Sequence, residues 1–170
     1  MNLVPGAPAW LLAVLFVAMA AAAIEDFIRL RISNITCAAV LVTALIVMPL
    51  QGFTLDLWQN AVVCAVLLTA GTLMFAAGRI GGGDVKLFAG LGLWVNISAG
   101  VWLVSTALLA GGVLALIYII VRHLRNGAKT KGIPYGVAIV AGASVVFAGQ
   151  LGLMKYKAEP ANVFAVQPNG

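Results

Sequence analysis

The chain has 170 residues, of which 63% are hydrophobic and only 9% are charged, with a mean hydropathy of +1.09 and a formal net charge of +5. Soluble domains carry about 25% charged residues, so this composition excludes an ordinary soluble domain. A chain of 170 residues also has no room for a large soluble domain beside several membrane spans. Basic residues at the ends of spans orient membrane proteins. We interpret the positive charge in that way and expect no nucleic-acid partner.

Six apolar segments follow one another along the chain, separated by short loops. Each is a candidate membrane helix, and short loops are typical of antiparallel neighbours in a helical bundle. We therefore predict an all-α fold, a polytopic membrane helical bundle of about six transmembrane helices. One membrane domain covers residues 1–154 and a C-terminal tail covers residues 155–170. The predicted segments are 9–25, 34–50, 58–78, 84–98, 100–121 and 133–153, and the fourth is short and rich in glycine.

Lysine and arginine are distributed unequally between alternate loops. Eight of the ten lie in or beside the loops that follow the first, third and fifth segments. The other two, Lys155 and Lys157, lie in the tail. Short loops rich in Lys and Arg stay in the cytoplasm. We therefore expect both termini outside, and the end of the first segment and the start of the fourth at the cytoplasmic face.

Asp26 and Asp84 lie at those two places, 58 positions apart. An ionisable residue at membrane depth is costly and is by default a candidate functional residue. Two carboxyl groups that meet around one water can share a proton: the ionised one takes a proton from the water and the protonated one polarises a peptide carbonyl. Because such a pair titrates as a unit, neither residue is assigned a fixed role. The pattern predicts an aspartic protease site within the membrane.

Three glycines, Gly81, Gly82 and Gly83, come directly before Asp84. Glycine adopts φ > 0 readily and lets another chain approach the backbone closely. We expect such a geometry here, with a substrate backbone lying against the loop.

Each aspartate also has an ordinary interpretation. Asp84 could cap the N-terminus of the fourth segment, and Asp26 could be a solvated flanking charge paired with Arg29 one helical turn further on. Glu25 faces about 100° away from Asp26 on a helix, and we interpret it as an interfacial charge.

Other site chemistries lack their sequence patterns. No paired His or Cys positions suit a metal ion, no G-x-S-x-G turn is present, and the glycine run lacks the Gly-Lys-Ser/Thr ending of a phosphate loop. We expect neither a metal nor another cofactor.

Three stretches resemble the type IV prepilin peptidases, a family of membrane aspartyl proteases. The stretch 81–84 matches their GxGD signature, and Val85-Lys86-Leu87 matches its continuation. The stretch 26–34 is similar to the first aspartate motif, in which an Asp and basic residues precede Ile-Pro-Asn, and 134–139 is similar to a Pro-Tyr-Gly segment in the last span. The resemblance covers about residues 10–150, in the family's order.

The resemblance implies an aspartic endopeptidase that removes the leader of type IV prepilins at the cytoplasmic face of the bacterial inner membrane. Asp26 and Asp84 would be its catalytic pair. Its partners would be prepilin or pseudopilin precursors, with a short leader and an apolar helix, and membrane lipid. Residues that match the motifs and would support the loop or the substrate are Gly81, Gly83, Lys86, Asn34, Pro134, Tyr135 and Gly136.

Two features separate this chain from the larger members. It has no cytoplasmic insertion with Cys-x-x-Cys motifs, so it resembles the short form of tight-adherence (Flp) pilus systems, and N-methylation of the new pilin N-terminus stays open. Ser33 replaces the usual proline and Ile28 a common arginine. The alternative function is a transport or pilus-assembly protein whose aspartates carry protons; the lack of a second glycine–aspartate loop counts against it.

Overall fold

The computed structural model describes residues 1–52, 54–124 and 134–152. The predicted tail, 155–170, and the basic residues of the 125–131 stretch lie outside these ranges. Within them every regular element is helical, which confirms the all-α prediction. A short 3-10 helix, η1 (Val4–Gly6), precedes six α-helices: α1 (Ala9–Arg29), α2 (Asn34–Leu50), α3 (Leu57–Ala76), α4 (Gly82–Gly92), α5 (Ile97–Leu124) and α6 (Tyr135–Gln150).

Three of these helices are long and apolar enough to cross a membrane: Ala9–Arg29, Leu57–Ala76 and the Ile97–Val121 part of α5. The helices α2 and α6 are shorter but also apolar. Their length and composition are those of a membrane helical bundle, because a span needs about 20 apolar residues and shorter helices can lie within the bundle.

The fourth predicted segment differs from the others. Its helix begins at Gly82 and ends at Gly92, so it has 11 residues and a length of about 16 Å. A hydrocarbon core is about 30 Å thick, and α4 therefore does not reach across it. It lies among α2, α3 and α6, and the turn that follows it contains the fully buried Trp94.

Close backbone contacts hold the bundle together. A Cβ atom on Gly142 would lie 2.5 Å from the Ala107 nitrogen, so α5 and α6 pack backbone to backbone, and the Thr106 hydroxyl donates to the Gly142 carbonyl at 3.1 Å. Trp94 packs against Phe147 with ring centroids 6.4 Å apart. Its indole nitrogen donates to the Val40 carbonyl at 3.2 Å, which joins the α4–α5 turn to α2.

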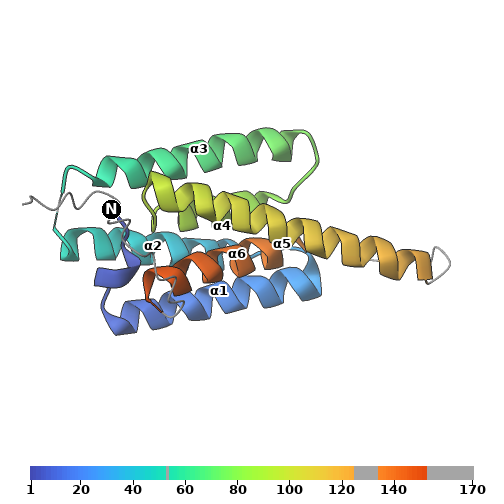
Figure 1. The fold of residues 1–170 in the computed structure, drawn as a ribbon, viewed down its shortest axis with the longest axis horizontal. Coiled ribbons are helices and arrows are strands. Elements are labelled where there is room, and N and C mark those ends of the chain that lie inside the picture. The colour runs from blue at the N-terminus through green and yellow to red at the C-terminus, as the bar shows by residue number, and fades with distance from the viewer. Residues whose placement is uncertain (53, 125–133, 153–170) are drawn as a thin grey trace, which may run out of the picture.

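The turn after α1, the loop after α3 and the C-terminal end of α5 all lie at one end of the bundle (Figure 1). The N-terminal segment lies at the other end, where the Leu3 nitrogen donates to the Trp94 carbonyl. This alternation agrees with the predicted grouping of the basic loops. Which face of the membrane that end occupies stays a prediction.

Candidate active site

Asp26 lies in the last turn of α1 and is 3% exposed. Its Oδ2 atom accepts hydrogen bonds from the main-chain N–H groups of Gly136 at 2.6 Å and Val137 at 3.3 Å. These residues form the first turn of α6, where N–H groups have no partner within the helix. The positive end of the helix dipole also points there, so α6 supplies a binding site for the Asp26 carboxylate. The solvated-charge interpretation of Asp26 is therefore wrong.

Asp84 lies in the first turn of α4 and is 7% exposed. Its Oδ2 atom accepts a hydrogen bond from the Gly81 N–H at 3.1 Å. Gly81 is the N-cap residue and Asp84 the third residue of the helix. The capping interpretation is thus correct in part, because the carboxyl caps the helix from inside its first turn. Among residues 1–52, 54–124 and 134–152, both aspartates accept their hydrogen bonds through Oδ2.

Ile32, in the turn between α1 and α2, contacts the neighbourhood of both aspartates. A Cβ atom on Gly83 would lie 2.9 Å from the Ile32 carbonyl oxygen, and a Cβ atom on Gly136 would lie 2.7 Å from Ile32 Cδ1. Gly83 precedes Asp84, and Gly136 donates to Asp26. One buried residue therefore packs against both main-chain segments that hold the carboxyl groups.

The two carboxyl groups also interact through space. Burial raises the pKa of Asp84 to about 6, with the negative charge of Asp26 as the next cause, while the Gly81 N–H acts in the opposite direction. Like charges that are close resist double ionisation. Asp84 therefore holds its proton to a higher pH than an isolated aspartate does, as a shared-proton pair requires.

The glycines before Asp84 act differently from the prediction. The φ of Gly81 is −77°, and Gly82 and Gly83 are already helical; positive φ occurs at Gly78 instead, with a φ of 69°. The expected close approach is present at Gly83, but the chain that approaches it is the protein's own Ile32. The third motif stretch is also brought to the site: Pro134 precedes α6, and Tyr135 and Gly136 begin it.

Lys86 and Asn34 come together as a pair. The Lys86 ammonium group donates to Asn34 Oδ1 at 2.8 Å and joins α4 to the start of α2. Two positions along a helix turn a side chain by about 200°, so Lys86 lies on the opposite side of α4 from Asp84. There the pair lines one end of an otherwise apolar groove of about 340 Å³ between α2, α3 and α4.

Sequence reasoning missed the part played by Glu25, which is bonded to protein and is not a free interfacial charge. Its Oε2 atom accepts from the Ser33 N–H at 2.8 Å and from the Thr36 hydroxyl at 3.1 Å. Ser33 is the N-cap of α2, and its hydroxyl accepts from the Thr36 N–H at 3.2 Å. Serine before an apolar run is a helix-start signal, which explains how Ser33 begins α2 in place of the family's proline.

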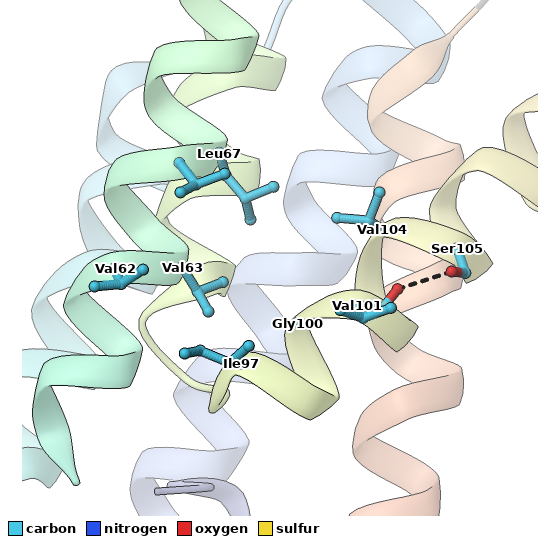
Figure 2. A pocket seen from close by; sticks show the side chains of 9 residues that line it. Val62, Val63, Leu67, Ile97, Gly100, Val101, Val104 and Ser105 are labelled. Carbon is cyan, nitrogen blue, oxygen red and sulfur yellow. Dashed lines mark hydrogen bonds between the residues drawn. The ribbon is translucent and has the colours of Figure 1, made fainter.

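Figure 2 shows a second cavity, of about 300 Å³, between α3 and α5. Its lining is aliphatic apart from Ser105, whose hydroxyl donates to the Val101 carbonyl at 2.8 Å. No ionisable side chain lines it, so it has no group for acid–base chemistry. In the described part of the chain, no three His, Cys, Asp or Glu side chains gather in a way that could hold a metal ion.

No curated protein and no solved structure matches this chain. The sequence model of the type IV leader peptidase family matches residues 13–120, a region that contains both Asp26 and Asp84 and ends before the Pro-Tyr-Gly stretch. This match covers more than half of the 170 residues. The chain therefore belongs to the type IV leader peptidase family.

Proposed function

We propose that this protein is an aspartic endopeptidase that removes the leader peptide of type IV or Flp-like prepilins at the cytoplasmic face of the bacterial inner membrane. The observation that carries the proposal is that two carboxyl groups, Asp26 from α1 and Asp84 from α4, are buried at one end of a bundle of apolar helices, where the charge of Asp26 helps to raise the pKa of Asp84. Membership of the leader peptidase family supplies the reaction class.

The pair works with one proton between its two carboxyl groups. Asp26 accepts two main-chain N–H bonds at the start of a helix and Asp84 accepts one. Hydrogen bonds to a carboxylate favour its charged form, so the arrangement favours an ionised Asp26 and a protonated Asp84 as the resting state. Burial and the negative charge of Asp26 raise the pKa of Asp84 to about 6, so this carboxyl keeps its proton up to a higher pH than an ordinary aspartate does.

In this state Asp26 takes a proton from a water molecule held between the carboxyl groups, and the water oxygen attacks the scissile carbonyl carbon. Asp84 donates its proton toward the carbonyl oxygen and stabilises the tetrahedral intermediate. Asp26 then gives its proton to the leaving nitrogen while Asp84 takes back the proton from the hydroxyl formed on the carbonyl oxygen. The C–N bond breaks, and the products are a leader carboxyl group and a new pilin amino terminus. The substrate's apolar helix would remain in the membrane, and its leader would lie beside the basic loops.

Co-expression with candidate prepilins tests the proposal, with the ratio of precursor to mature pilin read on a gel. The parent chain should remove the leader, and cleavage should occur between the leader and the apolar helix, as determined by mass spectrometry of the mature pilin. If a folded parent chain in the membrane left every prepilin tested intact, the alternative of a proton-carrying membrane protein would be favoured.

A further inference from the structure

The turn between α1 and α2 spans residues 30–33 and is held in a shape that the backbone does not favour. Leu30 has a φ of 52° and lies in the left-handed region, which is unfavourable for a residue other than glycine. A turn of this kind persists only where its surroundings hold it. In this turn Ile32 packs against Gly83 and Gly136, so the shape of the turn affects both aspartates.

Glu25, in the last turns of α1, fixes this turn through hydrogen bonds to Ser33 and Thr36. Its Oε2 atom receives the Ser33 N–H and the Thr36 hydroxyl, and the Ser33 and Thr36 hydroxyl groups lie 2.8 Å apart. These bonds join the last turn of α1 to the first turn of α2. Hydrogen bonds to a charged acceptor are about twice as strong as neutral ones. Glu25 is also the residue before Asp26, so any rotation of the end of α1 moves both side chains together.

We propose that Glu25 is a positioning residue for the carboxyl pair: by holding Ser33 it fixes Ile32 between Gly83 and Gly136, and so sets the separation of Asp26 and Asp84. This inference rests on the proposed role of the two aspartates. It extends that role to a residue that touches neither the water nor the substrate and acts through the turn.

Ser33 makes the inference testable because only a residue with an N–H can bond Glu25 in this way. A proline at position 33, as in the Ile-Pro-Asn pattern that the stretch resembles, has no N–H. The φ of Ser33 is −71°, which lies in the range that proline fixes, so the backbone accepts Ser33→Pro. Proline would then stiffen the turn by itself, and Glu25 would matter less.

The first experiment is a double-mutant cycle on leader cleavage. Glu25→Ala should lower kcat by about 10- to 100-fold, since a misplacement of about 1 Å costs about 10²-fold, and KM should change little because the substrate does not contact Glu25. Glu25→Gln keeps one acceptor oxygen and should lose less. In the Ser33→Pro background the loss caused by Glu25→Ala should shrink at least several-fold, because contacting residues are non-additive. An equal loss in both backgrounds would overturn the inference.

The second experiment measures the pair without catalysis. A hydrophobic carbodiimide modifies protonated carboxyl groups, so labelling of Asp84 at different pH values, read by peptide mass spectrometry in lipid vesicles, reports when it loses its proton. Asp26 of α1 raises the pKa of Asp84, and the charge of Asp84 acts in turn on Cys37 of α2. On the same helix Lys86 lies on the other side and bonds Asn34. Arg79 follows α3, and Tyr135 begins α6. If Glu25 sets the separation, Glu25→Ala should move the labelling midpoint down by up to about one pH unit.

The matched variants separate position from charge. Glu25→Gln and Glu25→Ala both remove one negative charge, so a purely electrostatic effect would shift the midpoint equally in both, and an equal shift would overturn the inference. Asp56→Asn removes a charge before α3, at the other end of the bundle, and should leave the labelling midpoint of Asp84 unchanged.

A midpoint that is the same in parent, Glu25→Gln and Glu25→Ala would overturn the inference. If Glu25→Ala fails to fold, Glu25→Gln in the Ser33 and Ser33→Pro backgrounds gives the same test. A parent that labels as expected but cleaves no prepilin would count against the proposed function alone.

Discussion

One end of the bundle buries the amide group of Asn60, and the other end buries the carboxyl groups of Asp26 and Asp84. Asn60 is fully buried, and its amide nitrogen donates to the Met1 and Leu93 carbonyls at 2.8 Å each. Asn60 Oδ1 also accepts from the Met1 ammonium group at 3.1 Å. The side-chain amide is neutral, and its bonds join the N-terminal segment to α3 and to the turn after α4. The carboxyl groups are bonded only through Oδ2 within the described chain.

This difference shows how a buried polar group can be judged. A neutral group whose donors are paired lowers the cost of its own burial and stabilises the fold. Two carboxyl groups buried near each other raise that cost, because the negative charge of one disfavours ionisation of the other. Burying the two carboxyl groups therefore costs stability. If they form the proposed catalytic pair, substitutions there should lower cleavage more than stability, and substitutions at the Asn60 end should lower stability more than cleavage.

The largest expected effect is on cleavage by Asp26→Asn and Asp84→Asn. Asparagine keeps the size of each side chain but can neither take nor share the proton, so each variant should lose at least about 10²- to 10⁴-fold in rate, the usual contribution of acid–base catalysis. Both should stay in the membrane. Initial rates of leader removal in vesicles, divided by the amount of folded protein, measure this loss. Substantial cleavage by either variant would remove that residue from the catalytic pair.

The second effect tests the close approach at Gly83 with a pair of matched substitutions. Gly83→Ala would place a methyl group 2.9 Å from the Ile32 carbonyl oxygen, whereas Gly82→Ala would place one 3.4 Å from the Phe75 ring, an ordinary contact. Displacing the turn by about 1 Å should slow cleavage by up to about 100-fold in Gly83→Ala and leave Gly82→Ala near the parent rate. Equal rates in the two variants would mean that the glycines form only a linker.

Asn60→Leu tests the end of the bundle opposite the carboxyl groups, where the expected effect is on stability and not on cleavage. It removes the two donors and leaves the Met1 and Leu93 carbonyls without their bonds, which should cost about 1–3 kcal/mol of stability. Thermal unfolding in detergent should show the loss, while the cleavage rate per folded molecule stays near that of the parent. A variant that unfolds normally but cleaves slowly would show that the two ends are coupled.

Much of the fold follows from hydropathy, and the exceptions have physical reasons. The start of α2 at Asn34 was predictable because serine at position 33 is a good N-cap. The end of α4 was not, because the turn after it is itself apolar: Trp94 and Val95 are buried beneath the N-terminal segment. Hydropathy depends on residue type alone, so an apolar turn has the same mean hydropathy as an apolar helix and the two cannot be told apart.

The sequence was enough to predict which residues form the candidate site, but not how they are arranged. Burial cost alone singles out Asp26 and Asp84. The bonds of Glu25 depend on the left-handed turn at Leu30, and no periodic pattern predicts a positive φ at a leucine. The contact of Ile32 with Gly83 and Gly136 joins residues from three helix junctions, and a single sequence contains no signal for it.

The smallest expected effect is a shift in the titration of Asp84. Below pH about 6 its carboxyl is mostly protonated, and as the pH rises through that value the proton is lost and carbodiimide labelling should fall. Asp26→Asn removes the neighbouring negative charge, so the labelling midpoint should move down. It should stay above the ordinary value of 3.8, because burial is the larger cause of the raised pKa and is unchanged. Asn60→Leu, at the opposite end, should leave the midpoint in place. A midpoint that did not move in Asp26→Asn would mean that the two carboxyl groups do not interact, and would separate Asp84 from Asp26 even if both proved necessary for cleavage.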